Sequence, residues 1–131
     1  MATRLVDTDV FSYFFKSHPL AARYRPHLFG YRAAITFMTV GETYEWGYRS
    51  GWGPGRFARL EMSLRNYAVL DPTDEICRRF GAVRHERRHQ PISVADAWVA
   101  ATALVYGFEL VTHNVADFQG IKGLVLISEA P

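Results

Sequence analysis

Short apolar runs alternate with helical patterns along the chain, and this alternation limits the possible folds more than any other feature. Strands that are separated by helices pair in parallel, because each return to the same end of a sheet needs a crossover connection. Five runs have the composition of strands, at residues 4–7, 32–38, 68–71, 108–114 and 123–128. We therefore predict a three-layer α/β/α domain with a mostly parallel central sheet of about four to five strands.

The segments between these runs carry the spacing and the end signals of helices. Pro54 stands at one predicted start and Gly107 at one predicted end, where these residue types are common. The predicted helices cover residues 10–15, 18–30, 39–50, 54–67, 72–89 and 94–107, with a helical turn at 115–118. The length of 131 residues suits one core, so we expect residues 1–131 to form a single domain.

The composition indicates neither a membrane segment nor a disulfide. No apolar run reaches the roughly 18 residues of a membrane helix, and Asp7 and Asp9 lie where a signal peptide would be apolar. Cys77 is the only cysteine, so no internal disulfide can form. We therefore expect a cytoplasmic protein.

The positive charge is concentrated in arginine and in one segment. Of the 15 basic residues all but Lys16 and Lys122 are arginine, and five arginines with two histidines lie within residues 78–89. Guanidinium groups suit phosphate, so this segment could contact a phosphate backbone. A solvated helix face, in a chain whose codon usage favours arginine, explains the same pattern.

Four acids have a similar location relative to the predicted elements. Each follows a predicted strand or lies at the start of a predicted helix. They are Asp7, Glu42, Asp96 and Asp117. Three of them end a capping-box pattern, in TVGE (39–42), SVAD (93–96) and NVAD (114–117). A helix cap explains any one of these acids, but caps give no reason for acids to coincide with strand ends.

Carboxylates at the carboxyl ends of parallel strands are expected to converge, because these ends meet at one edge of the sheet. Two unit charges about 5 Å apart repel by roughly 3 kcal/mol at an effective dielectric near 20, so the cluster needs a cation or shared protons. An all-oxygen set suits Mg²⁺ or Mn²⁺, whereas the five histidines lack the spacing of a zinc site. The acids therefore predict metal-dependent phosphoryl chemistry, on nucleic acid or on a small phosphate ester.

Three motifs then carry a resemblance to a known family. They are LVDTDVFSYF (5–14), TFMTVGETYEWG (36–47) and PISVADAWVAATALVYGFELVTHNVADFQGIKGLVLIS (91–128). With these motifs the chain resembles the PIN-domain ribonucleases, and among them the VapC toxins of bacterial toxin–antitoxin pairs. The third motif is the most specific, because its helix, its strand end and its Asp-Phe pair keep the family's order and spacing. The resemblance implies a PIN-like fold over the chain.

Carried over position by position, the resemblance implies a set of catalytic residues that also bind Mg²⁺ or Mn²⁺. These residues are Asp7, Glu42, Asp96 and Asp117. Asn114 stands where many PIN domains have Asp, so either Asp117 or Asn114 completes the metal site. Thr8 and Thr112 are expected to support the site through their hydroxyl groups. Asp9 is expected either to support the site as a water-binding residue or to cap the first helix.

The same resemblance implies RNA hydrolysis with a 5′-phosphate and a 3′-hydroxyl product, control by a small cognate antitoxin, and a homodimer. Arg84, Arg87 and Arg88 are then candidates for RNA contact. The antitoxin is expected in a groove beside the first helices, to which aromatic side chains contribute. The candidates are Phe11, Phe14, Phe15, Tyr44, Trp46, Tyr48 and Trp52.

Two other interpretations fit parts of the sequence. DTDVF (7–11) resembles the D-x-D-x-(T/V) opening of haloacid dehalogenase-type phosphatases, in which Asp7 would be the nucleophile and Asp9 the general acid. Position 11 is Phe, however, and neither Lys16 nor Lys122 is placed to act as the phosphate-binding lysine of those enzymes. The second alternative is a PIN fold kept as a catalytically inactive binding module.

Overall fold

The computed structural model describes all residues, 1–131, and contains one five-stranded sheet with the strand order β3-β2-β1-β4-β5. Every pair of neighbouring strands is parallel, and β1 lies in the centre between β2 and β4. The strands are β1 (Thr3–Val6), β2 (Arg32–Thr36), β3 (Ala68–Leu70), β4 (Glu109–Val111) and β5 (Leu126–Ile127). The predicted α/β architecture with a parallel central sheet is confirmed.

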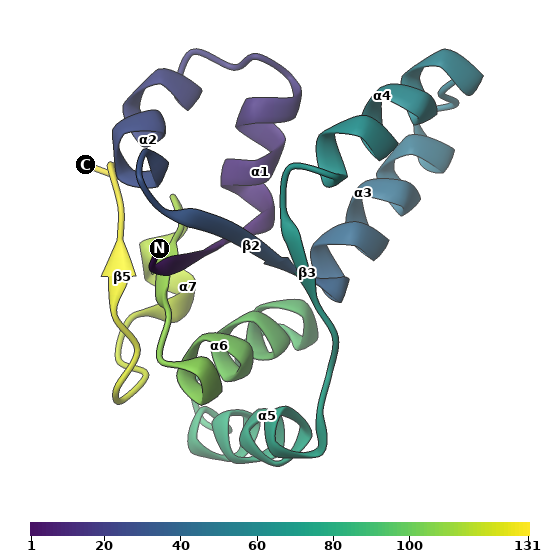
Figure 1. Cartoon of the computed structure of the whole chain (residues 1–131). Coiled ribbons are helices and arrows are strands. Elements are labelled where there is room, and N and C mark those ends of the chain that lie inside the picture. Colours follow the sequence, from purple (N-terminus) through teal and green to yellow (C-terminus); the bar gives the residue numbers. More distant parts are fainter.

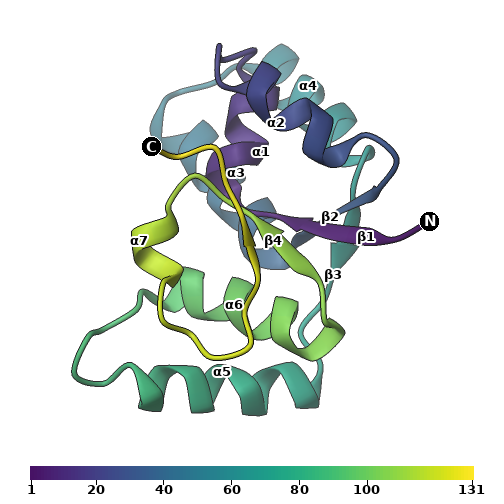
Figure 2. The ribbon, with the colours of Figure 1, turned by 90° about the vertical axis from the view of Figure 1, so that its left-hand side faces the viewer.

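Helices cover both faces of this sheet (Figure 1). The pair α5 and α6 lies on one face, and α1 to α4 lie on the other. Figure 2 shows the short α7 beside the amino-terminal end of α6. The helices are α1 (Thr8–Phe15), α2 (Ala21–Leu28), α3 (Phe37–Arg49), α4 (Pro54–Leu64), α5 (Asp74–Glu86), α6 (Val94–Tyr106) and α7 (Val115–Phe118).

Two hydrophobic clusters hold these layers together, one on each face of the sheet. Successive strand residues point to opposite faces, so Leu5 packs in the cluster that contains the apolar side of α6, while Val6 packs with Phe11 of α1 and with Tyr24. Because both faces of the central strand are buried, its carboxyl end at Asp7 is held firmly in place.

Several predicted element boundaries differ from the structure. The predicted strand 32–38 ends at Thr36, which is the N-cap of α3, so α3 begins at Phe37 and not near Thr39. The prediction was wrong because Ile, Thr and Phe in this segment are typical of strands, and the strand runs directly into the helix. The run 123–128 likewise contributes only Leu126–Ile127 to the sheet. None of the helices is long and apolar enough to span a membrane.

Candidate functional site

Asp7 lies at the carboxyl end of the central strand and is the N-cap residue of α1. The residue is only 4% exposed. One carboxylate oxygen accepts the main-chain N–H of Thr8 at 2.9 Å, and the other accepts the hydroxyl of Thr112 at 2.7 Å. Thr112 follows β4, the strand beside β1, so two neighbouring strand ends fix this carboxylate. The expected support from Thr112 is present in the geometry.

The surroundings of Asp7 oppose its negative charge. Burial first, then the neighbouring charge of Asp9 and that of Asp96, raise the pKa of the Asp7 carboxyl from 3.8 to about 8. The hydrogen bonds from Thr112 and Thr8 lower this pKa without offsetting the burial. Near neutral pH the carboxyl therefore holds a proton unless a cation takes the proton's place.

Asp9 does not cap the first helix, because Asp7 has that position. Asp9 lies in the first turn of α1, and one of its oxygens accepts the Val10 N–H at 2.7 Å. The other accepts the main-chain N–H of His113 at 3.0 Å, which ties α1 to the segment after β4. Burial is the main cause that raises the pKa of the Asp9 carboxyl above its ordinary value. Asp9 thus belongs to the acidic cluster itself.

His113 is a residue of the site that the sequence analysis missed. Its ring nitrogen Nδ1 is hydrogen-bonded to the hydroxyl of Tyr24, a buried residue of α2. The same hydroxyl accepts the main-chain N–H of Glu129 at 3.0 Å. A continuous set of hydrogen bonds therefore joins Asp9 to the carboxyl-terminal segment through His113 and Tyr24.

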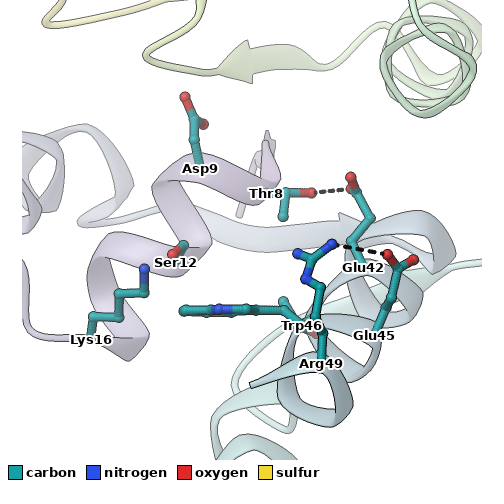
Figure 3. Close-up of a pocket in the computed structure, with 9 residues that line it drawn as sticks. Thr8, Asp9, Ser12, Lys16, Glu42, Glu45, Trp46 and Arg49 are labelled. Atoms are coloured by element: carbon teal, nitrogen blue, oxygen red, sulfur yellow. Dashed lines mark hydrogen bonds and ion pairs between the residues drawn. The ribbon is translucent and has the colours of Figure 1, made fainter. Parts of the chain in front are cut away.

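Glu42 reaches the site from the second turn of α3. Its Oε1 accepts the hydroxyl of Thr8 at 2.8 Å, as Figure 3 shows. The Thr8 hydroxyl has a single hydrogen, so it accepts from the Thr39 hydroxyl, also at 2.8 Å. The predicted capping box in TVGE is wrong, because Thr39 lies inside α3. Thr39 instead donates its hydroxyl to Thr8, a role that the sequence analysis missed. Its position one helical turn before Glu42 places both side chains on the same side of α3, and this spacing could have indicated the role.

Asp96 lies in the first turn of α6, and one half of the capping box predicted there is present, without a hydrogen bond from the Ser93 main-chain N–H to the Asp96 carboxylate. The hydroxyl of Ser93, the N-cap residue, accepts the main-chain N–H of Asp96 at 3.1 Å. The pKa of the Asp96 carboxyl is raised, mainly by burial and further by the charges of Asp117, Glu42 and Asp9. These three carboxylates come from α7, α3 and α1, so acids far apart in the chain act on one another here.

Asp117 is exposed on α7, and its capping box does not form. Its main-chain N–H bonds to the carbonyl oxygen of Asn114 at 3.1 Å, and the Asn114 side chain caps nothing. The box fails because Asn114 does not have the extended backbone that an N-cap residue usually adopts. Asp117 and Asp96 line a hollow of about 360 Å³ together with Arg87.

Four of the acids thus lie around two hollows, whereas Asp7 is buried and lines neither of them. Asp9 and Glu42 line a cleft of about 500 Å³ between α1 and α3, and Asp96 and Asp117 line the hollow beside α6 and α7. As these side chains stand, no three His, Cys, Asp or Glu residues are close enough together to hold one ion. The donor set is nevertheless all oxygen and repels itself, which is the chemistry that Mg²⁺ or Mn²⁺ suits. An ion held by all four predicted ligands would require the acids of the two hollows to move closer together.

All three arginines predicted to contact RNA donate to main-chain carbonyl oxygens. Arg84 donates to the carbonyl of Ile92 at 2.8 Å, and Arg87 donates to that of Gln90 at 2.8 Å. Arg88 donates to the carbonyl of His85 within its own segment. These bonds hold the connection between α5 and α6, and a contact of the three arginines with RNA stays a prediction.

Known proteins resemble this chain over nearly its whole length. The PIN domain family model matches residues 4–123. Ribonuclease VapC1 of Haemophilus influenzae (strain R2866) is 30% identical over 124 residues, which are 92% of each chain. The tRNA(fMet)-specific endonuclease VapC of Shigella flexneri is 25% identical over 122 residues, again 92% of each chain.

Solved structures agree with this resemblance. The structure of VapBC-1 from nontypeable Haemophilus influenzae has a TM-score of 0.82 and 28% identity, and covers 96% of this chain and 97% of that one. The DNA-bound VapBC from Salmonella typhimurium has a TM-score of 0.86 and 25% identity, with 98% of each chain covered.

The fold, the acids at its strand ends and the family match lead to one assignment: the chain belongs to the PIN-domain family. Within that family, the relatives that it matches along most of their length are VapC ribonucleases. The geometry of Asp7 also argues against a phosphatase nucleophile, because both of its carboxylate oxygens accept hydrogen bonds and the side chain is buried.

Proposed function

We propose that this protein is a metal-dependent endoribonuclease and the toxin of a toxin–antitoxin pair. One observation carries the proposal: the carboxylates of Asp7, Asp9 and Asp96 lie at the starts of α1 and α6, where the charges of Asp9 and Asp96 add to burial in raising the pKa of Asp7, and the charge of Asp9 does the same for Asp96. Such a cluster is stable near neutral pH with a bound cation. The similarity to VapC ribonucleases supports RNA as the substrate.

In this proposal a single set of carboxylates holds Mg²⁺ or Mn²⁺. The set is Asp7, Glu42, Asp96 and Asp117. When bound, the ion supplies Lewis-acid chemistry, which stabilises negative charge on the phosphodiester and makes hydroxide available near neutral pH. Thr112 and Thr8 orient Asp7 and Glu42 through the hydroxyl bonds described above, and Asp9 keeps the segment after β4 against α1. Asp117 is the fourth ligand in preference to Asn114, because the charge of Asp117 acts on Asp96.

RNA cleavage tests the proposal. The protein is incubated with a pool of single-stranded and structured RNAs and with Mn²⁺, Mg²⁺ or EDTA, and the fragment ends are mapped. Cleavage should require the divalent ion, leave 5′-phosphates, and fall by at least about a hundredfold in Asp7→Asn. Asp74→Asn is the matched control, because Asp74 is an exposed acid on α5 that pairs only with Arg78. A folded protein that binds RNA without cutting it would be the inactive binding module.

The proposed partner is a small antitoxin protein, since the similar solved structures include complexes named toxin–antitoxin and VapBC. Phe11 and Phe15, expected in its groove, are buried in the core. An apolar groove of about 270 Å³ lies instead beside α2, and its walls include Phe14, Leu28 and Phe29.

Phe29 is 86% exposed and lines this groove, in which five of the seven lining residues are hydrophobic, and an exposed apolar groove of this kind suits a protein partner. Phe29→Ser should weaken co-purification with the product of an adjacent small gene without changing RNA cleavage. Met62→Ser is the control, because Met62 is an exposed apolar residue of α4 outside this groove.

A homodimer in solution is also proposed. Light scattering measures the molar mass of the protein in solution and so tests this proposal.

A further inference from the structure

The cleft between α1 and α3 extends beyond the carboxylates, and its far end has no part in the proposed metal site. Of the nine residues that line the cleft, Trp46 is the only hydrophobic one. Figure 3 shows Asp9 and Glu42 at one end and Lys16 beside Trp46 toward the other, while the guanidinium group of Arg49 is turned toward Glu45. The cleft therefore has acids alone where the metal is proposed, and farther along it has two cations, Lys16 and Arg49, against the one acid Glu45.

The spacing of the two helices produces this arrangement. Asp9 and Lys16 are seven residues apart, as are Glu42 and Arg49. Seven residues make about two helical turns, so each acid and its cation start from one side of their helix, with their backbone positions roughly 10 Å apart. The helix dipole favours acids at a helix start and cations at its end. The helix dipole does not explain why the acid and the cation of both helices face the same cleft.

Trp46 holds the ammonium group of Lys16 inside the cleft. The Nζ atom lies 3.9 Å from the centre of the Trp46 ring, and the edge of Trp52 packs against that ring at 5.1 Å between centroids. Lys16 forms no salt bridge, and the single one of Arg49 is a 3.4 Å contact with Glu45 in which both side chains are 72% exposed. Both cations can therefore bind an anion at little cost in lost contacts.

We infer that this end of the cleft binds single-stranded RNA beside the bond that is cut, with Lys16 and Arg49 as the phosphate-binding residues. Trp46 is a positioning residue, which keeps Lys16 over the cleft. The inference rests on the proposed function. A strand whose reacting phosphate lies at the carboxylates has its following phosphates within reach of cations about 10 Å away. Such contacts carry no sequence preference and make binding depend on salt.

The test removes one charge and keeps the side chain's bulk. Lys16→Met retains the apolar stem over Trp46 and loses the ammonium group. For a fluorophore-labelled single-stranded RNA with Mn²⁺, KM should rise about five- to tenfold with kcat unchanged, and the slope of log Kd against log salt should fall by about 0.7. Lys16→Arg should restore both quantities. Trp46→Leu should give a smaller rise in KM, since the cation stays but is no longer held.

Lys122→Met is the matched control. Lys122 is the only other lysine, and it is exposed on the turn before β5, outside the cleft. The KM of the Lys122→Met variant, and its slope of log Kd against log salt, should equal those of the unaltered protein. Equal values for Lys16→Met and Lys122→Met would overturn the inference, as would a fall in kcat at constant KM or an effect confined to binding of a protein partner.

The design separates this inference from the proposed function. If Asp7→Asn abolishes cleavage while Lys16→Met leaves KM and the salt slope unchanged, the nuclease assignment stands and the phosphate contact is wrong. If no RNA is cut but fluorescence anisotropy still gives the smaller salt slope for Lys16→Met, the contact stands and the assignment fails. Melting temperatures within about 2 °C of the unaltered protein confirm that the variants are folded.

Discussion

The two hollows that hold the acids are built in different ways. Around α1 and α3, the carboxylates of Asp7 and Glu42 accept hydroxyl hydrogen bonds from Thr112 and Thr8, and Asp9 accepts a main-chain N–H. Around α6 and α7, no hydrogen bond from another element reaches the carboxylate of Asp96 or Asp117. The fold therefore fixes the first half of the site, whereas in the proposed metal site the second half depends on the cation to organise it.

The largest expected effect is the pH dependence that Asp7 confers on the metal-free protein. Its pKa in the folded state, about 8, lies above the ordinary 3.8, so between these values the folded protein binds a proton that the unfolded chain lacks. The free energy of unfolding must then fall as pH rises through this range. In thermal melts with EDTA, Tm should drop by roughly 10 °C between about pH 5 and 8.

Asp7→Asn should abolish most of this slope, and Mg²⁺ or Mn²⁺ should flatten it in the unaltered protein, because the ion replaces the proton. An Asp7→Asn variant with the full slope would contradict the role assigned to this carboxyl.

Removing a hydroxyl from the first half should come next in size. Thr112→Val leaves the buried carboxylate of Asp7 without one of its donors, which should cost about 1–3 kcal/mol of unfolding free energy and about tenfold or more in metal affinity. Urea unfolding and Mn²⁺ titration measure the two losses. Thr102→Val is the control, because that equally buried hydroxyl bonds only to the carbonyl of Trp98 in its own helix. Equal losses in both variants would mean that the hydroxyl supports packing alone.

The position of α3, which carries Glu42, depends on a close contact at Gly47. A Cβ atom there would lie 2.6 Å from the Phe57 ring and 2.7 Å from the Trp52 ring. Gly47→Ala should therefore cost about 1–3 kcal/mol and lower RNA cleavage by shifting the helix. Gly41→Ala in the same helix meets nothing within 4 Å and should raise stability by up to about 1 kcal/mol. Thermal melts measure both changes. Equal melting temperatures for Gly47→Ala and Gly41→Ala would refute the close contact of residue 47 with the Phe57 and Trp52 rings.

The smallest effects on stability are expected in the second half. Ser93→Ala removes the cap of α6 and should cost about 1 kcal/mol. Asp117→Asn should change stability by no more than about 0.5 kcal/mol, because the residue is exposed, yet it should weaken Mn²⁺ binding. Calorimetric titration beside thermal melts separates the two quantities. A large loss of stability in Asp117→Asn would show that this half is as firmly built as the first.

The fold was predictable because its determinants are local. Alternating strand and helix patterns, the caps at Thr73 and Ser93, and the left-handed Gly107 can all be recognised in short segments. The start of α3 was not predictable, because the strand and the helix share a run of β-type residues without a turn between them. For the same reason a local pattern suggested that Thr39 caps a helix.

The site was predictable in its acids and not in its connections. Asp7 and Asp96 follow from their positions at a strand end and a helix start, whereas Glu42, which was placed at a helix start, lies in the second turn of α3. The assignment of the three acids as metal ligands stays a prediction. The bond between Asp9 and the His113 amide joins residues 104 positions apart and leaves no trace in either segment. The approach of Lys16 to Trp46 likewise depends on how α1 and α3 pack.

The bonds of the Tyr24 hydroxyl have a practical consequence for anyone who labels this protein. The hydroxyl is bonded to the amide of Glu129 and to His113, whose own amide holds Asp9. A reporter fused after Pro131 would strain these hydrogen bonds and so displace Asp9, even though the reporter lies outside the cleft. The amino end, where Met1 is 88% exposed, is the safer place for an affinity handle or a dye.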